Sequence, residues 1–362
     1  MRLHIRLWSK PLTMSTIPWP KRDVGIVQIN ALAHGMMSMG GNVYGAAAAD
    51  EERFEVLDRL WELGQTNWDT AHMYGDAEEL IGKWLAKHPE RRPEIFLATK
   101  FGVQLVPHTA IRGDPEFVKE QLATSLKRLQ TDYIDLYYQH RPDPKTPIEV
   151  TVKVLAEFIK EGKIRQYGLS DSSVTTIRRA QKIHPMAAIQ IEINPFARAA
   201  LAPGGLVETA SELGITVFAY APNAAGMAVG RFKSPDELPQ GDIRRGLPRY
   251  QPEVFPHALE LSETFASIGR ALSPAAPYTA SQVCLAWVAA QASNVIPVPG
   301  SSSVKRTEEN CRAVNVFGQL GEEHLALIRA ALKKTDETVA KASRRQPGAG
   351  ELSFVETPEY VP

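Results

Sequence analysis

The chain has 362 residues, with 41 Lys and Arg against 41 Asp and Glu, so its formal net charge at pH 7 is zero. A balanced chain lacks the basic stripe that a nucleic-acid-binding protein needs. A hydrophobic fraction of 44% with 23% charged residues excludes a disordered chain, and no apolar run reaches the roughly 18 residues of a membrane span.

The N-terminal segment is basic and contains no acid before Asp23. We expect residues 1–22 to form a disordered or mobile extension, because its three prolines argue against a long targeting helix. The alternative is a weak organelle presequence, which such composition also resembles.

Cys284 and Cys311 form no CxxC pair and are too few for a disulfide framework. Two reduced thiols favour a reducing compartment, and we expect the cytoplasm.

Short β-type runs alternate with helical patterns along the chain, which is typical of βα units around a parallel sheet. Runs such as IFLATK, IQIEI and TVFAY are almost continuously apolar, as parallel strands buried on both faces should be. Strands are predicted at Val24–Ile29, Thr66–Thr70, Ile95–Lys100, Tyr133–His140, Arg165–Ser170, Ala188–Ile193, Thr216–Tyr220 and Val295–Pro299.

Helix-start signals lie between these runs. Asp50 precedes the amphipathic stretch EERFEVLDRLWEL, and Asp114 with Pro115 forms an N-cap followed by a proline at the first helical position. Thr279 and Gln282 have the spacing of a capping box. Each of the eight strands is followed by a helical pattern. Although the length alone would suggest roughly two domains, this alternation predicts one α/β domain, a closed (β/α)₈ TIM barrel.

The barrel is expected to occupy residues 23–320, and two segments depart from its repeat. Residues 222–256 are rich in Pro and Gly and follow the seventh strand, which places this long loop on the carboxyl-terminal face of the barrel. Residues 321–362 contain a C-terminal helix and a tail. The tail would either cover the same face or remain solvated.

Four side chains of complementary chemistry lie at or beside the ends of successive strands: Asp69, Tyr74, Lys100 and His140. In a barrel these ends converge on one face, so the four would meet around one pocket. A phenol with a pKa near 10 is a poor acid at neutral pH unless its phenolate is stabilised, and Lys100 would lower that pKa. Asp69 would keep the lysine charged, and His140 would orient a carbonyl. The set is suited to protonating an oxygen as it becomes an alkoxide.

Each residue alone has a simpler explanation. Asp69 fits a turn or a helix cap, Tyr74 an interface aromatic, Lys100 a long side chain at the surface, and His140 a loop residue bonded to backbone. Their joint occurrence at consecutive strand ends favours a single site.

The segments WDTAHMYG, ATKFG and LYYQHR, which carry these residues, resemble the aldo-keto reductase superfamily, and the likeness extends over roughly residues 23–315. The stretch from YIDLYYQHRPDPKTPIE to EGKIRQYGLSDSS is similar to the microbial and fungal branch with pyridoxal reductases and related aryl-aldehyde reductases. The resemblance implies a (β/α)₈ barrel, NADPH as the cofactor, no metal, and a catalytic tetrad formed by Asp69, Tyr74, Lys100 and His140.

The same resemblance implies where the cofactor binds. The segment PVPGSSSVKRTEEN is similar to the family's adenosine-phosphate motif, and Lys305 with Arg306 would hold a 2′-phosphate. Without the resemblance, the segment is a predicted helix N-terminus, and such a terminus can bind a phosphate by itself. The alternative is that its two cations belong to a solvated face. By the resemblance, the nicotinamide and its ring are contacted at four positions, and the phosphates and adenine at six. These are Ser170, Asp171, Gln190 and Tyr220, and then Ser301, Ser303, Lys305, Arg306, Glu309 and Asn310.

The loop after the seventh strand departs from the family pattern. The family commonly has Ser-Pro-Leu-Gly-x-Gly there, whereas this chain has Ala-Pro-Asn-Ala-Ala-Gly from Ala221, a position that would contact the cofactor. The first strand reads INALAHGMM instead of a glycine-rich motif, which brings His34 into that loop. Both changes affect the surroundings of the cofactor and substrate.

These observations predict an NADPH-dependent carbonyl reductase that acts on a small-molecule aldehyde or ketone, either as a monomer or as a homo-oligomer. Tyr44, Phe101 and Phe196 are candidates for its pocket walls. A catalytically weak NADPH-binding regulatory barrel is the alternative, favoured by the altered loops and disfavoured by the complete tetrad. A metal-dependent hydrolase is not supported, because no HxH pair lies on a strand.

Overall fold

Eight parallel strands form the centre of the fold. The computed structural model describes residues 17–41, 47–104, 110–238, 240, 242–343 and 354–361. The strands lie in the order β12-β11-β10-β9-β8-β5-β4-β3. They are β3 (His34–Gly35), β4 (Asn67–Asp69), β5 (Phe96–Phe101), β8 (Ile134–Gln139), β9 (Ile164–Ser170), β10 (Ala188–Glu192), β11 (Thr216–Tyr220) and β12 (Val295–Val298).

The sheet closes between its first and last strands. A parallel bridge joins Gly35 to Gly300, and the Ala33 and Gly35 amides donate to the carbonyls of Pro297 and Pro299 at 2.9 and 3.0 Å. The predicted (β/α)₈ barrel is therefore confirmed.

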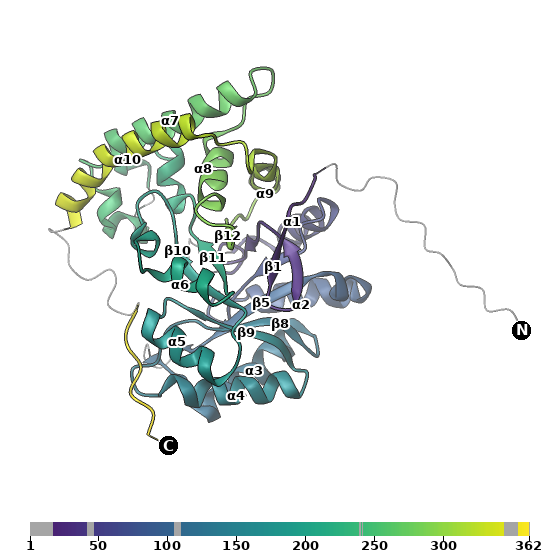
Figure 1. Ribbon diagram of the computed structural model, residues 1–362. Coiled ribbons are helices and arrows are strands. Elements are labelled where there is room, and N and C mark those ends of the chain that lie inside the picture. The colour runs from purple at the N-terminus through teal and green to yellow at the C-terminus, as the bar shows by residue number, and fades with distance from the viewer. Residues whose placement is uncertain are drawn as a thin grey trace, which may run out of the picture.

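Helices surround the barrel, and α10 packs along α7 (Figure 1). The capping box of Thr279 and Gln282 is present, and the Asp114 side chain accepts from the Phe117 amide. In the described part of the chain, no helix has the length and apolarity needed to cross a bilayer. The helices are α1 (Asp50–Glu62), α2 (Ala77–Lys87), α3 (Pro115–Leu129), α4 (Ile148–Lys160), α5 (Val174–Ile183), α6 (Leu206–Glu212), α7 (Phe255–Leu272), α8 (Ala280–Ala289), α9 (Val304–Arg312) and α10 (Glu322–Ser343).

Short elements complete the chain. Two short strands, β6 (Val103–Gln104) and β7 (Ala110–Ile111), pair after β5. The described residues of the long loop after β11 contain four 3₁₀ turns before α7 begins. The 3₁₀ turns are η1 (Pro89–Glu94), η2 (Ala199–Leu201), η3 (Ala224–Val229), η4 (Pro235–Glu237), η5 (Ile243–Gly246), η6 (Pro248–Tyr250) and η7 (Ala313–Val316).

The predicted first strand, Val24–Ile29, is wrong. These residues belong to an antiparallel hairpin of β1 (Lys21–Val24) and β2 (Val27–Asn30). Its turn needs Gly25, whose φ of 53° lies in the left-handed region. The hairpin packs Val24 against the apolar interior of the barrel, and the short β3 takes the place of the first barrel strand.

Part of the predicted N-terminal extension is folded. Trp19 Nε1 donates to the Leu63 carbonyl at 2.7 Å, and Lys21 lies in β1. Residues 1–16 of the predicted extension lie outside the described residues.

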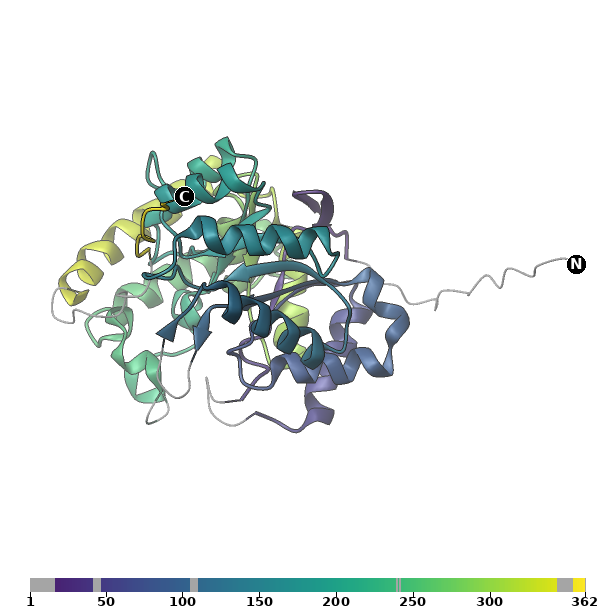
Figure 2. The same cartoon turned by 90° about the horizontal axis from the view of Figure 1, so that it is seen from below.

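The C-terminal segment 354–361 lies beside α5 in both views (Figures 1 and 2). Its Phe354 amide donates to the Asp171 carbonyl at 2.7 Å. Arg179 of α5 donates to the carbonyls of Thr357 and Pro358 at 3.0 and 2.6 Å. The beginning of this segment is thereby fixed at the carboxyl end of β9.

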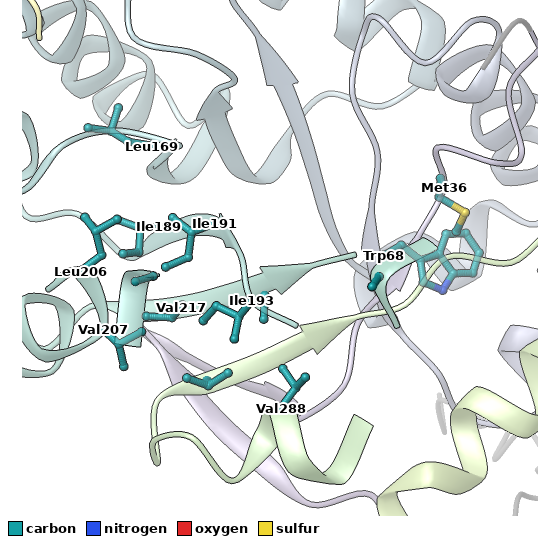
Figure 3. Close-up of a cluster of buried hydrophobic side chains, with 14 of the residues drawn as sticks. Met36, Trp68, Leu169, Ile189, Ile191, Ile193, Leu206, Val207, Val217 and Val288 are labelled. Carbon is teal, nitrogen blue, oxygen red and sulfur yellow. The ribbon is translucent and has the colours of Figure 1, made fainter. Parts of the chain in front are cut away.

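Apolar side chains pack in two layers, one inside the barrel and one between strands and helices. Successive residues of a strand point to opposite faces, so Ala98 of β5 faces the interior with Tyr138, whereas Leu97 faces the helices. Figure 3 shows the outer layer, in which residues of β10 and β11 pack against α6 and α8. The rigid barrel holds the carboxyl ends of its strands at fixed positions, and the candidate site lies there.

Candidate active site

Asp69 and Lys100 form a buried ion pair at the ends of β4 and β5. Lys100 Nζ lies 2.5 Å from Asp69 Oδ1 and 2.7 Å from the Thr70 carbonyl. Their side chains are 0% and 3% exposed for lysine and aspartate. Burial alone would lower the pKa of Lys100, but the Asp69 carboxylate outweighs it and holds that pKa above its usual value. The ammonium is therefore charged at neutral pH.

Tyr74 lies in the loop between β4 and α2, with its ring centroid 5.1 Å from Lys100 Nζ. Burial raises the pKa of the Tyr74 phenol, the Lys100 charge acts against it, and the Asp69 carboxylate adds to the increase. Lys100 lowers this pKa, as predicted, but the net direction is upward. Burial, which the sequence did not show, outweighs the cation. The phenol keeps its proton at neutral pH, and the lysine is placed to stabilise the phenolate.

His140 follows β8 and meets Tyr74 edge to face, with ring centroids 5.7 Å apart at 84°. Burial together with the charges of Lys100 and Arg141 holds the pKa of His140 well below its usual value, so its imidazole is neutral. Its Nδ1 is buried with no hydrogen-bond partner among the described residues. The structure thus brings all four predicted tetrad residues together.

Gln190, predicted to contact the cofactor, faces the tetrad. Its Nε2 donates to Asp69 Oδ2 at 2.7 Å, and its side chain is buried within the barrel. Asp69 therefore accepts from an ammonium on one oxygen and from an amide on the other.

Ser170, Asp171 and Tyr220 gather at the ends of β9 and β11. The Tyr220 hydroxyl donates to Asp171 Oδ2 at 2.9 Å, and Arg141 Nη1 lies 3.1 Å from the same oxygen. Arg141 also approaches Ser170 Oγ, at 3.5 Å. Burial raises the pKa of Tyr220, and the Asp171 charge adds to the increase. Arg141 was not singled out from the sequence, although it directly follows His140.

The predicted phosphate segment forms the start of α9. Ser303 is its N-cap and accepts from the Arg306 amide, and Ser301 Oγ accepts from the Ser303 amide at 3.1 Å. Lys305 and Arg306 are exposed in the first turn. Exposed cations at a capped helix N-terminus suit a phosphate.

The adenine positions lie further along α9. Asn310 is buried, and the Glu309 carbonyl accepts from Gln282 of α8 at 3.1 Å. His34, expected in a loop, lies instead in β3, where its Nε2 approaches the Ser301 carbonyl at 3.2 Å. Burial lowers the pKa of His34 to about 4.

The loop after β11 is strained. Ala221, Ala224 and Ala225 have φ values of 48°, 50° and 55°, a region that residues with a Cβ rarely adopt. The Tyr250 hydroxyl holds the turn by hydrogen bonds to the carbonyls of Ala224 and Ala225 at 3.2 and 2.8 Å. This conformation is the one that glycine adopts most readily.

Of the predicted wall residues, the two that the structure describes do not lie against the tetrad. Tyr44 lies outside the described residues. Phe101 is fully buried on the helix side of β5, with its ring centroid 4.8 Å from that of Tyr137. Phe196 lines a separate groove of about 680 Å³ together with Trp287.

No group of three or more metal-binding side chains that could hold an ion occurs among the described residues. Both cysteines are buried, and burial raises the pKa of Cys311 to about 12. Neither thiol belongs to the site.

The profile of the "Aldo/keto reductase family" matches residues 31–333. Aldo-keto reductase str7 of Strobilurus tenacellus is 45% identical over 325 residues, covering 88% of this chain and 94% of that protein. Aldo-keto reductase yakc [NADP(+)] of Schizosaccharomyces pombe is 40% identical over 345 residues, covering 94% and 98%.

Solved structures show the same architecture. The glycerol dehydrogenase AKR11B4 from Gluconobacter oxydans superposes with a TM-score of 0.75 at 23% identity, covering 95% of this chain and 99% of that one. The holo form of aldo-keto reductase AKR11C1 from Bacillus halodurans gives 0.66 at 27% identity, covering 88% and 96%.

Proposed function

The chain belongs to the aldo/keto reductase family, and on that premise we propose that it reduces an aldehyde or ketone with NADPH, with Tyr74 as the general acid. The observation that carries the proposal is the contact of a charged, buried Lys100 with both Asp69 and the Tyr74 ring. The similarity to pyridoxal and aryl-aldehyde reductases remains a prediction about the substrate.

The residues present fit the cofactor. Exposed Lys305 and Arg306 at the start of α9 would hold its 2′-phosphate, and Asp171 and Tyr220, which are hydrogen-bonded to each other, would hold the nicotinamide. A relative that is 40% identical over nearly the whole chain is named as NADP(+)-dependent. When bound, NADPH supplies the hydride for the carbonyl carbon.

The chain's own residues supply the proton and orient the carbonyl oxygen of the substrate. His140, kept neutral by burial and neighbouring cations, donates a hydrogen bond that orients the carbonyl oxygen. Tyr74 gives its proton to that oxygen as negative charge develops. Lys100 stabilises the resulting phenolate, and Asp69 keeps the lysine charged while Gln190 holds Asp69 in place. The proton then returns to the phenolate from solvent.

The test is oxidation of NADPH, followed at the nicotinamide absorbance band, with purified protein and a panel of aliphatic and aromatic aldehydes and ketones. We expect turnover with at least one substrate class and its loss in Tyr74→Phe, with NADPH affinity retained. Full activity in Tyr74→Phe would refute the assigned acid. NADPH binding without turnover across the panel would favour the regulatory barrel instead.

A further inference from the structure

The segment that carries Tyr74 is held at both ends. At its beginning, the Thr70 carbonyl is held by a hydrogen bond that Lys100 Nζ donates to it at 2.7 Å. At its end stands Asp76, two positions after Tyr74 and directly before α2. The position of the phenol therefore depends on what holds Asp76.

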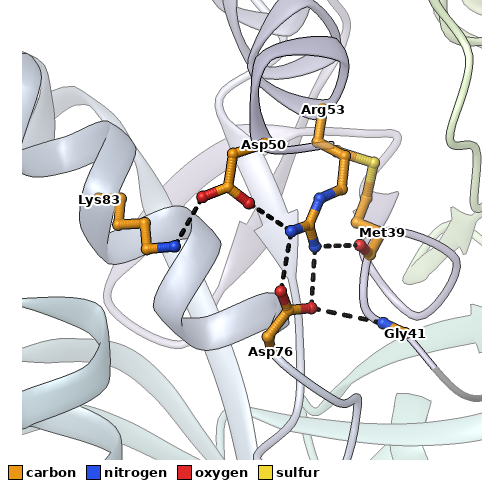
Figure 4. Close-up of polar contacts among 6 residues, drawn as sticks. All are labelled: Met39, Gly41, Asp50, Arg53, Asp76 and Lys83. Carbon is orange, nitrogen blue, oxygen red and sulfur yellow. Dashed lines mark hydrogen bonds and ion pairs between the residues drawn. The ribbon is translucent and has the colours of Figure 1, made fainter. Parts of the chain in front are cut away.

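Asp76 is held by Arg53 of α1 (Figure 4). Arg53 donates from Nη1 to Asp76 Oδ1 and from Nη2 to Asp76 Oδ2, each at 2.8 Å. The same guanidinium donates to the Met39 carbonyl at 2.9 Å and to Asp50 at 2.5 Å. The Arg53 side chain is only 7% exposed. A bidentate pair between a guanidinium and a carboxylate fixes orientation as well as distance.

The carboxylate of Asp76 does not cap α2, although Asp76 is the N-cap residue of that helix. Asp76 is the N-cap of α2, where an aspartate side chain normally accepts a backbone amide of the first turn. Here it makes no such bond. It takes both Arg53 bonds and approaches the Gly41 amide at 3.4 Å, so it serves the contact between loops rather than the helix.

The loop gripped by Arg53 packs directly on the backbone of Tyr74. A Cβ on Gly40 would lie 1.7 Å from the Tyr74 carbonyl oxygen, and one on Gly75 would lie 2.5 Å from the Gly41 oxygen. With φ of +56°, Gly75 also needs the freedom of glycine. The two loops touch without intervening side chains, so movement of residues 39–41 moves Tyr74.

We propose that Arg53 is a positioning residue for the reduction, which fixes the Tyr74 hydroxyl between Lys100 and His140 by clamping Asp76 and Met39 together. The inference rests on the proposed role of Tyr74 as the acid. Arg53 itself touches no reacting atom; it acts through the backbone of the two loops.

The experiment compares Arg53→Met and Asp76→Asn with Arg92→Met. Arg92 is a matched control, since it is equally buried, pairs with Asp135 at 2.8 Å and donates to the Ile95 carbonyl. That clamp joins the beginnings of β5 and β8, at the far end of the barrel from Tyr74. Asp76 is 45% exposed, so Asp76→Asn tests the clamp even if Arg53→Met fails to fold.

We expect kcat to fall by about 10- to 100-fold in both clamp variants, as a displacement of the acid by a fraction of an ångström predicts. NADPH affinity and the KM of the carbonyl should stay close to wild type. Arg53→Lys should recover only part of the rate, because an ammonium cannot form the bidentate pair. Arg92→Met should lower the Tm without lowering kcat.

The pH profile separates positioning from general stability. Burial raises the pKa of Tyr74, so a loosened loop should move the alkaline limit of kcat down toward the ordinary tyrosine value near 10. Arg92→Met should leave that limit unchanged. A wild-type kcat and pH profile in Asp76→Asn would overturn the inference, whereas full activity in Tyr74→Phe would overturn the proposed function.

Discussion

Gln190 Nε2 donates a 2.7 Å hydrogen bond to Asp69 Oδ2, the oxygen that Lys100 does not take. The family resemblance implies that this glutamine contacts the cofactor, but its amide supports the carboxylate that keeps Lys100 charged. The two roles predict different outcomes when the amide is removed.

Gln190→Leu should lower kcat by about tenfold or more and the free energy of unfolding by about 1–3 kcal/mol, because it leaves one oxygen of a buried carboxylate unbonded. Steady-state kinetics and urea denaturation measure both. Gln166→Leu is the control, since that buried amide accepts from the Ile26 backbone at the hairpin. If Gln190→Leu weakens NADPH binding and leaves kcat intact, the glutamine acts on the cofactor instead.

Gly40→Ala should impair catalysis without touching any tetrad side chain. The new methyl group would lie 1.7 Å from the Tyr74 carbonyl oxygen, a distance that forces the loop to move. We expect kcat to fall by at least about tenfold with little change in NADPH affinity measured by fluorescence. Gly246→Ala is the control, because a Cβ there meets nothing within 4 Å. Equal rates for the two variants would contradict the tight contact.

Removal of the exposed cations at the start of α9 should change cofactor preference. Lys305→Ala and Arg306→Ala should each weaken NADPH binding by about 10- to 100-fold, as loss of one charge-assisted hydrogen bond predicts. NADH lacks the 2′-phosphate, so its affinity should hardly change. Titration of each variant with both cofactors measures the ratio. A parallel loss for NADH would mean that these residues do not recognise the 2′-phosphate.

Stability should depend on pH through His34. Burial lowers the pKa of His34 from 6.5 to about 4, so between these values the unfolded chain binds the proton more readily than the folded one. The free energy of unfolding therefore decreases as pH falls through this window, by about 3 kcal/mol in all. Because His140 is shifted in the same direction, it adds to the decrease.

Urea denaturation of wild type and His34→Gln between pH 7 and about 4 should show a shallower dependence in the variant. His257→Gln, at a half-buried position of α7, serves as the comparison variant. An unchanged slope in His34→Gln would show that this imidazole takes up its proton in the folded protein as readily as in the unfolded chain.

The barrel was predictable because its buried parallel strands are apolar runs. Seven of the eight predicted strands correspond to β4, β5, β8, β9, β10, β11 and β12. The exception is β3, which has two residues, His34 and Gly35, too few to produce any pattern. The apolar stretch before it was mistaken for one strand because the two-residue turn at Gly25 and Ile26 is marked by a single glycine within an apolar run.

The site was predictable only in part. Residue type and strand-end position pointed to Asp69, Tyr74, Lys100 and His140, which the barrel brings together. Phe101 was misplaced although strand alternation argues against it: Lys100 faces the interior, so its neighbour must face the helices. The Arg53–Asp76 pair left no signal, because a contact between two helix starts depends on three-dimensional packing rather than on spacing along the chain.

The contact of His34 with the Ser301 carbonyl spans 267 positions of sequence, and it lies at the seam where the Gly35–Gly300 bridge closes the barrel. Loop closure over such a separation costs conformational entropy, and the contact cannot form before β12 has been synthesised. During synthesis, β3 must therefore wait with one edge unpaired while most of the polypeptide is made. Refolding should be slow for the same reason, and the phosphate end of the site should be the last part of the molecule to acquire protection from hydrogen exchange.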